Sequence, residues 1–312
     1  MQFRILGSPE LYDEKRQQRI PLTSRKQRLL LGALLARPNS PVPRERLIRE
    51  LWGALPPKKA RNTLNAHVSG LRKALAEAEP DRIASTRLVA RSAGYLLETR
   101  ATETDSGQFC LAVAQAQRTA AQDPYGAHDL LRRALGLWRG TALEGGAHGP
   151  VCAALAARLE EERQQALEIL FDCALRMGQH HRIVPELEEV CAAHPLRERF
   201  HDQLMLALCR SGRGAEAIGV YTRARHRLTA EHGHTRLLSA RLEQISVQAP
   251  TLFGPELDAA DDWTRVEVTA LPSAADRDFD RDFDRDFDRP ARSVMGYLTE
   301  LLSGQALYTG GV

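Results

Sequence analysis

Amide and hydroxyl side chains recur along one predicted helix, which begins near Lys58 and ends near Ala76. Spacings of three and four place its apolar residues on one face: Ala60, Leu64, Val68, Leu71 and Leu75. The opposite face is polar and basic, with small residues between: Lys59, Asn62, Thr63, Ala66, Ser69, Gly70 and Lys73. Amides and hydroxyls can hydrogen-bond to base edges, and lysines can pair with phosphates. We therefore predict base contacts from Asn62, Thr63 and Ser69, and phosphate contacts from Lys59 and Lys73.

Glycine costs a helix interior about 1 kcal/mol relative to alanine. We interpret Gly70 as allowing another molecule to approach this face closely.

The elements around this helix follow the plan of a winged helix-turn-helix. We expect strands at 3–6 and 20–22, a helix capped by Thr23 or Ser24, a short helix at 44–51, a loop at 52–57, and a hairpin of strands 83–90 and 94–98. The third helix fits the major groove, which is about 12 Å wide. Arg25, Lys26 and Arg44 would hold the DNA backbone on either side. At the hairpin tip, Arg91 would enter the minor groove, with Arg87 nearby.

Charge is distributed unevenly along the 312 residues. Residues 1–100 contain 20 Lys and Arg against 9 Asp and Glu, a net charge of +11, whereas residues 101–312 have a net charge of −8. A basic first domain joined to an acidic remainder is typical of a protein in which only the first domain meets a polyanion.

The second half has a helical pattern almost throughout, and the fold class is mainly α with small β elements. Helices are predicted at 107–121, 126–138, 151–178, 181–193, 198–211, 213–232 and 236–246. The stretch from Gly214 to Tyr221 resembles half of a tetratricopeptide unit, which indicates a helical-repeat array. We expect a domain at 1–98, a polar linker at 99–106, a helical domain at 107–246, and a mostly disordered tail at 247–312 with a possible helix at 294–308.

No pattern for a catalytic nucleophile, a metal site or a phosphate-cradling loop is present, so we expect neither an enzyme nor a cofactor. The five cysteines lie in helical, apolar surroundings and form no CxxC pair; they are Cys110, Cys152, Cys173, Cys191 and Cys209. We interpret them as buried, reduced thiols. No signal peptide or membrane span is apparent, so a cytoplasmic, nucleoid-associated protein is expected.

Residues 3–246 resemble the Streptomyces antibiotic regulatory protein family. The matching stretches keep the family's order and spacing: Leu51-Trp52-Gly53, Pro56-Pro57, 60–64, His67-Val68-Ser69, 71–75, Gly94-Tyr95, 134–140, 195–198 and 212–221. The resemblance implies an OmpR-type DNA-binding domain followed by a bacterial transcriptional activation domain of tetratricopeptide-like helices. It also implies an activator of a secondary-metabolite gene cluster, which binds direct repeats as side-by-side copies and engages the sigma and alpha subunits of RNA polymerase.

The motif match implies DNA-contacting positions at Arg44, Asn62, Thr63, His67, Ser69, Arg72 and Arg91. Helix geometry puts His67 and Arg72 on the flanks of the DNA face, so we assign them to phosphates. The loop that faces polymerase would be Trp52, Gly53, Ala54, Leu55, Pro56 and Pro57.

The chain departs from the family pattern in two places. The proline that the family usually has after Glu231 is missing, so the last helix is expected to be displaced. No GxxxxGK[ST] motif occurs, so the chain resembles the small class, without ATP binding at such a site.

Two alternatives use the same DNA contacts. In the first, the helical domain senses a small ligand, for which His180-His181 would be a candidate pocket. In the second, the protein is a repressor, since the DNA contacts themselves do not fix the sign of regulation.

Overall fold

The computed structural model describes residues 1–79, 87–145, 149–232 and 235–253. The predicted helix at 294–308 and most of the predicted disordered tail lie outside them. The described chain forms two compact units: residues 1–113 with 133–163, and residues 114–132 with 164–253.

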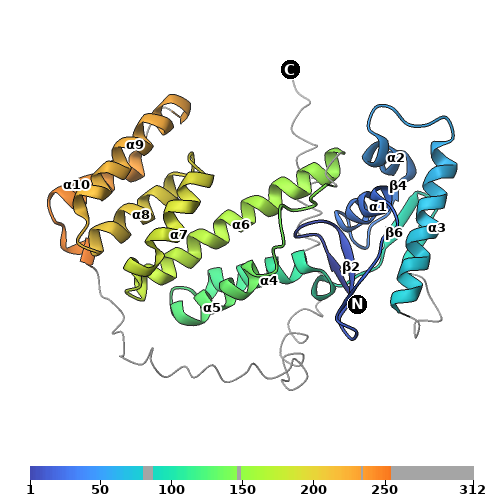
Figure 1. Ribbon diagram of the computed structural model, residues 1–312, viewed down its shortest axis with the longest axis horizontal. Coiled ribbons are helices and arrows are strands. Elements are labelled where there is room, and N and C mark those ends of the chain that lie inside the picture. Colours follow the sequence, from blue (N-terminus) through green and yellow to red (C-terminus); the bar gives the residue numbers. More distant parts are fainter. Residues whose placement is uncertain (80–86, 146–148, 233–234, 254–312) are drawn as a thin grey trace. The chain divides into compact units, whose positions relative to one another are not determined.

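The first unit begins with a three-stranded antiparallel sheet in the order β1-β2-β3, followed by three helices and a second small sheet (Figure 1). The strands of the first sheet are β1 (Gln2–Arg4), β2 (Glu10–Asp13) and β3 (Gln18–Ile20). The helices are α1 (Arg25–Leu35), α2 (Arg44–Trp52) and α3 (Ala60–Ala78). The second sheet has the order β4-β6-β5, with β4 (Val42–Pro43), β5 (Leu88–Arg91) and β6 (Gly94–Leu97). The predicted winged helix is confirmed, whereas β2 and β4 were not predicted.

Leucines from all three helices form the core of the winged helix, and each is at most 1% exposed: Leu30, Leu34, Leu47, Leu51, Leu64 and Leu71. Burying one such side chain contributes about 1.5–3 kcal/mol relative to leaving it exposed. Ser24 starts α1, because its side chain accepts a hydrogen bond from the Gln27 amide at 3.2 Å. The capping prediction is thus confirmed at the second of its two candidates.

Gly70 lies against α1 rather than against another molecule. A Cβ added at Gly70 would come within 2.2 Å of Gln27 Nε2. Gln27 is buried, and its Oε1 accepts hydrogen bonds from the amide and the hydroxyl of Thr23. The glycine therefore makes room for a side chain of the same domain, which corrects our interpretation of it.

Residues 99–106 are not the predicted polar linker. They contain a short 3-10 helix, Ala101–Glu103, and lead directly into α4 (Asp105–Thr119). Asp105 is 1% exposed, and its carboxylate accepts hydrogen bonds from the amides of Ile5 and Leu6 at 2.8–3.0 Å. Arg139 donates to the same carboxylate at 3.2 Å. Polar residues such as Asp105 in this segment thus make buried hydrogen bonds and are not those of a solvated linker.

A second buried carboxylate joins α2 to the start of α6 (Pro150–Arg176). Glu50 is 1% exposed and accepts hydrogen bonds from the amides of Val151 and Cys152 at 2.9 and 3.2 Å. These amides belong to the first turn of α6, where a helix leaves its N–H groups without partners of its own. Gly149 leaves the space, since a Cβ there would lie 2.1 Å from Glu50 Oε2. Glu50 thus caps α6 from the winged helix.

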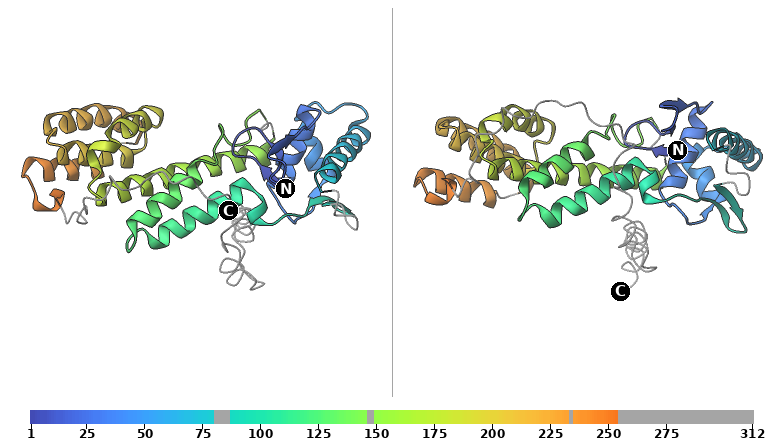
Figure 2. Two further views of the ribbon diagram at one scale, coloured as in Figure 1. Left: turned by 60° about the horizontal axis from the view of Figure 1, so that its bottom comes forward. Right: turned by 90° about the horizontal axis from the view of Figure 1, so that it is seen from below.

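The second unit is built of antiparallel helices at the predicted positions, and its helices from residue 180 onward are yellow to orange in Figure 2. Besides parts of α4, α5 (Pro124–Leu135) and α6, they are α7 (His180–Ala193), α8 (Glu198–Arg210), α9 (Gly214–His232) and α10 (Arg236–Ser246). A 3-10 turn follows at Pro250–Phe253. Its Leu252 is fully buried, so the first residues after the predicted domain boundary at 246 pack on the helical domain.

Small residues lie where helices of the second unit cross, as predicted for a tetratricopeptide-like array. Ala174, Ala207, Ala217 and Ala224 are each at most 1% exposed, and they share one core with Phe171, Phe200 and Leu238. Arg241 ties α10 to α8 through Asp202 at 2.7 Å. α10 therefore docks on α8 without the proline, and its displacement relative to other members of the family stays a prediction.

Replacing Glu50 with alanine should lower the free energy of unfolding by about 2–4 kcal/mol, because two buried N–H groups of α6 lose their acceptor. Urea denaturation measures this loss. Glu45→Ala is the matched control, since Glu45 is exposed on the same helix and its surface ion pair with Arg61 contributes at most about 1 kcal/mol. Equal losses in the two variants would contradict the capping role.

Candidate nucleic-acid interface

The amphipathic reading of α3 is confirmed. Leu64, Val68, Leu71 and Leu75 are at most 5% exposed and face the core, whereas Ala60 is half-buried. The opposite face exposes Asn62, Asn65, Ala66, Ser69 and Lys73. Among the residues that the structure describes, the side chains of Asn62 and Ser69 have no hydrogen-bond partner. Their amide and hydroxyl groups are therefore available to a ligand.

Thr63 and Lys59 lie at the first turn of α3. The Thr63 hydroxyl donates to the Lys59 carbonyl at 3.1 Å, so it is turned back along its own helix and is less available than predicted. The Lys59 side chain is exposed beside it. Lys73, 80% exposed, lies 3.9 Å from Glu77 one turn further along, and such a surface pair is weak.

Asn65 is a candidate that sequence reasoning missed, although it lies three residues after Asn62 and so on the same face. Its Oδ1 accepts a hydrogen bond from the Tyr95 hydroxyl at 2.9 Å, which connects α3 to the hairpin. The two Asn65 N–H groups remain for another acceptor. Helical spacing was the signal that could have identified it.

Two arginine side chains also lie near the ring of Tyr95. The guanidinium carbon of Arg44 lies 5.2 Å from the ring centre and that of Arg72 lies 6.0 Å away, within the range of cation–π attraction. Arg72 donates to the Leu88 carbonyl at 3.0 Å. One buried ring therefore connects α2, α3 and the hairpin, and it gathers the predicted contacts Arg44 and Arg72 beside the exposed face of α3.

The hairpin exposes the predicted arginine at its tip. Arg91 ends β5, and Arg91, Ser92 and Ala93 are all exposed before the chain turns at Gly94. Gly94 has a φ of 157°, and a Cβ there would lie 2.0 Å from the Val42 carbonyl oxygen of the neighbouring strand β4. Glycine is thus required for this turn, which carries Arg91 away from the domain.

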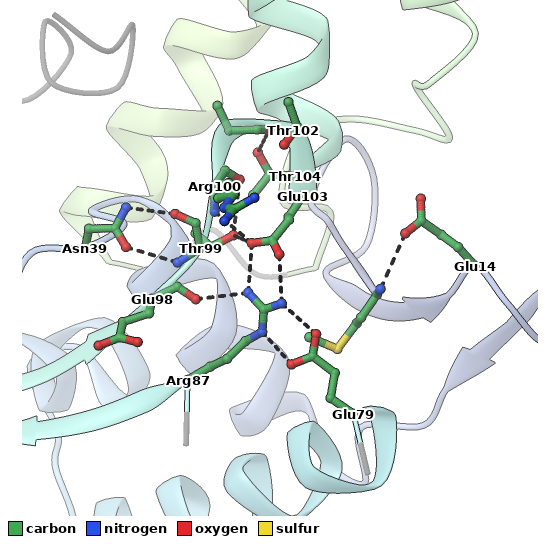
Figure 3. Close-up of polar contacts among 12 residues, drawn as sticks. Glu14, Asn39, Glu79, Arg87, Glu98, Thr99, Arg100, Thr102, Glu103 and Thr104 are labelled. Carbon is green, nitrogen blue, oxygen red and sulfur yellow. Dashed lines mark hydrogen bonds and ion pairs between the residues drawn. The ribbon is translucent and has the colours of Figure 1, made fainter. Parts of the chain in front are cut away.

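Arg87, the other predicted hairpin contact, is buried, and this corrects its assignment to DNA. It is 7% exposed, and Figure 3 shows its guanidinium between two carboxylates. It lies 2.6 Å from both oxygens of Glu79 and 2.8 Å from both oxygens of Glu103, and it also donates to the Glu98 carbonyl. The hydrogen bond to Glu79 raises the pKa of Arg87, and Arg87 holds the pKa of Glu103 at about 2 against the effect of burial.

Lys26 is also turned inward. It donates to the Leu51 carbonyl at the end of α2 and lies 5.5 Å from the ring centre of Trp52, and burial lowers its pKa. This geometry gives Lys26 a role in packing α1 on α2 in place of the predicted phosphate contact. Arg25, one residue earlier, is exposed and donates to the Gly145 carbonyl at 3.1 Å.

Trp52 and His67 contact each other, with ring centroids 6.1 Å apart. Both are half-buried, and burial together with the charge of Lys26 lowers the pKa of His67, which favours the neutral imidazole. A neutral ring makes a weaker phosphate ligand than the phosphate assignment from helix geometry assumes. Trp52 belongs to this cluster, so only Gly53 to Pro57 form the exposed part of the predicted polymerase loop. Leu55 in that loop is 87% exposed.

Four of the five cysteines are buried as predicted, and Cys209 is half-buried. Burial raises the pKa of Cys173 to about 11 and that of Cys191 to about 12, so these thiols stay protonated. The part of the chain that the structure describes contains no group of three His, Cys, Asp or Glu residues able to hold a metal ion. None of the described helices has the length and hydropathy that a membrane span requires.

A winged helix with an exposed polar third helix, followed by antiparallel helical repeats, defines a two-part transcriptional regulator. Family models agree with this class. Residues 17–97 match the C-terminal domain of transcriptional regulatory proteins, and residues 104–241 match the bacterial transcriptional activator domain.

Three of the curated relatives that the chain resembles come from Streptomyces. The chain is 39% identical to the regulatory protein AfsR of Streptomyces coelicolor, over 83% of this chain and 25% of AfsR. It is 38% identical to the transcriptional regulator RedD of the same species, over 67% of this chain and 60% of RedD. It is 34% identical to the regulatory protein DnrI of Streptomyces peucetius, over 71% of this chain and 82% of DnrI. The chain thus spans only a quarter of AfsR and about three fifths of RedD.

A solved structure of EmbR from Mycobacterium tuberculosis, in complex with a low-affinity phosphopeptide, superposes with a TM-score of 0.72 at 30% identity. The match covers 79% of this chain and 65% of EmbR. The chain belongs to the Streptomyces antibiotic regulatory protein family of transcriptional activators.

Replacing Arg87 with methionine should lower the free energy of unfolding by about 3–5 kcal/mol, because the carboxylates of Glu79 and Glu103 would lose the guanidinium that compensates their charges. Chemical denaturation measures this. The matched control is Arg91→Met on the same strand, which should leave stability within about 0.5 kcal/mol of the parent. A stable Arg87 variant would mean that the buried triad is not structural.

Proposed function

We propose that this activator binds promoter DNA sequence-specifically, with α3 in the major groove and the hairpin tip at the adjacent minor groove. The observation that carries the proposal is the exposed row of Asn62, Asn65 and Ser69 on α3. The buried leucines fix the orientation of that row. Asparagine amides can pair with two edge atoms of adenine, which distinguishes bases in the major groove.

Basic residues around this row supply the contacts that do not depend on sequence. Arg44 and Arg72 flank Tyr95, Lys59 and Lys73 lie at either end of the row, and Arg25 begins α1. Arginine and lysine contacts to phosphates position a protein on the duplex. Arg91 is the candidate for the minor groove, where A·T-rich sequence deepens the negative potential.

The finer parts of the proposal rest on family membership. The protein would bind direct repeats as side-by-side copies, recruit RNA polymerase through its sigma and alpha subunits, and activate a secondary-metabolite gene cluster. The exposed loop Gly53–Pro57 supports the polymerase contact, because Leu55 presents an apolar side chain to solvent beside the proposed DNA face.

Replacing Asn62 with alanine should weaken binding to the operator by about 1–3 kcal/mol and relax preference at one base position, because one bidentate contact is lost. Footprinting on the promoters of the neighbouring gene cluster first defines the operator. Binding titrations on the operator, and on variants of each base pair, then measure the loss. Equal weakening on operator and random DNA would remove Asn62 from base recognition.

Lys73→Ala serves as the contrasting variant in the same titrations. It should weaken binding to all sequences and reduce the slope of log affinity against log salt by about one, because one phosphate contact is lost. Lys15→Ala, at an exposed position in the turn after β2, should change neither quantity.

Replacing Leu55 with serine should leave operator affinity unchanged and reduce transcription by purified RNA polymerase, because an apolar contact outside the DNA face is removed. Val247→Ser is the matched control, since Val247 is 69% exposed in the second unit. Loss of DNA binding in the Leu55 variant, or full transcription by it, would overturn the polymerase contact.

A further inference from the structure

A cavity of about 230 Å³ lies inside the first unit, against the end of α1, the outer face of α2, the start of α4 and the first turns of α6. Neither the DNA face of α3 nor the loop Gly53–Pro57 contributes to it. The cavity therefore lies outside the machinery proposed above.

The walls of this cavity are apolar. Leu35 from α1 and Leu159 from α6 are buried in the wall, and Leu155 and Val151 of α6 are half-buried beside them. Ala154 also lines the cavity, and its small side chain is exposed to solvent. Burying the apolar part of a ligand against such a surface is favourable. An inorganic ion has no apolar surface to bury.

The rim of the cavity is cationic. Arg37, Arg46 and Arg49 line it, and no ion pair joins any of the three to another residue of the described chain. The Nε atom of Arg37 is buried and lacks a hydrogen-bond partner among the described residues. A buried donor of this kind costs about 1–3 kcal/mol when unpaired, so an acceptor in the cavity would relieve it.

A fourth arginine is already neutralised. Arg158 lies 2.6 Å from Glu162, and the Cys110 thiol donates to the same carboxylate at 2.8 Å. Glu162 is thus occupied by its own neighbours, and the positive charge of Arg37, Arg46 and Arg49 is left over.

We propose that this cavity binds a small amphipathic carboxylic acid, with its apolar body against α6 and its carboxylate at the arginines of α2. A guanidinium can donate two parallel hydrogen bonds to one carboxylate, which makes such pairs strong and specific. The volume is below the ~300–1,000 Å³ of drug-sized ligand sites, so the ligand is small, of about the size of a monocyclic aromatic acid.

The position of the site predicts its physical effect. Arg49 is followed in α2 by Glu50, which caps α6, so a ligand held by Arg49 and the wall of α6 bridges the same two helices. A ligand that binds only the folded protein raises its stability.

The test uses the full chain without DNA and two probes, 4-phenylbutyrate and its neutral amide 4-phenylbutanamide. Saturation-transfer NMR and calorimetric titration measure binding, and thermal unfolding measures stabilisation. The acid should bind and raise the unfolding temperature, and the amide should bind at least about ten times more weakly. The proposal is overturned if the acid does not bind at a concentration on the order of 10 mM, at which even very weak binding is detectable. It is also overturned if the acid and the amide bind equally.

Variants locate the binding. Arg46→Met with Arg49→Met should reduce the affinity for the acid to that for the amide, whereas Ala154→Trp should fill the cavity and abolish binding of both probes. Lys15→Met, at an exposed position outside the cavity, should bind both probes as the parent does. Unchanged binding in the Ala154 variant, or full competition by inorganic phosphate, overturns the proposal. None of these measurements involves DNA, so their failure is distinguishable from failure of the proposed DNA binding.

Discussion

Two buried carboxylates, Glu50 and Asp105, join the winged helix to the start of the activator domain. Each is 1% exposed, and each accepts backbone N–H groups from an element far away in sequence. A charge taken out of water is costly unless it is fully hydrogen-bonded, so separating these elements would expose two carboxylates and at least four amides at once. The winged helix therefore does not stand alone as a compact unit. Its compact unit continues into α4 and includes the first turns of α6.

This constraint changes what the two-part description of the family means for this chain. The family models divide the sequence near residue 100, and by sequence the division is correct. Physically, α2 of the winged helix also supplies the cap of an activator-domain helix, because Glu50 accepts the first-turn N–H groups of α6. The free arginines of α2 border the cavity at this same junction. A small molecule bound at a junction that is held by buried hydrogen bonds and contains a cavity can change the stability of both parts together.

The helices could be predicted from sequence because their evidence is local. Apolar spacing and breaks at glycine and proline placed α3 and α7–α10 within a few residues, and the exposed row through Asn62 and Ser69 followed from the same periodicity. The short strands β2 and β4 contain too few residues to show the alternation of apolar and polar residues that identifies a strand. Burial of a polar residue depends on a distant partner. Nothing near Arg87 indicates that it meets Glu103, and nothing near Gly70 indicates Gln27.

The positive charge of the first hundred residues illustrates the same difficulty. Composition counts every Lys and Arg equally, but the structure uses them in different ways. Arg87 holds a buried triad together and Lys26 caps α2, so neither adds freely to the field that DNA would meet. Arg44 and Arg72 serve the fold through Tyr95 and still face outward, while Lys59 and Arg91 are simply exposed. Long-range steering depends on total charge, whereas recognition depends on the few groups whose hydrogen-bonding capacity the fold leaves unused. Net charge therefore indicates the class of partner, and only the satisfied and unsatisfied donors of individual side chains indicate where that partner binds.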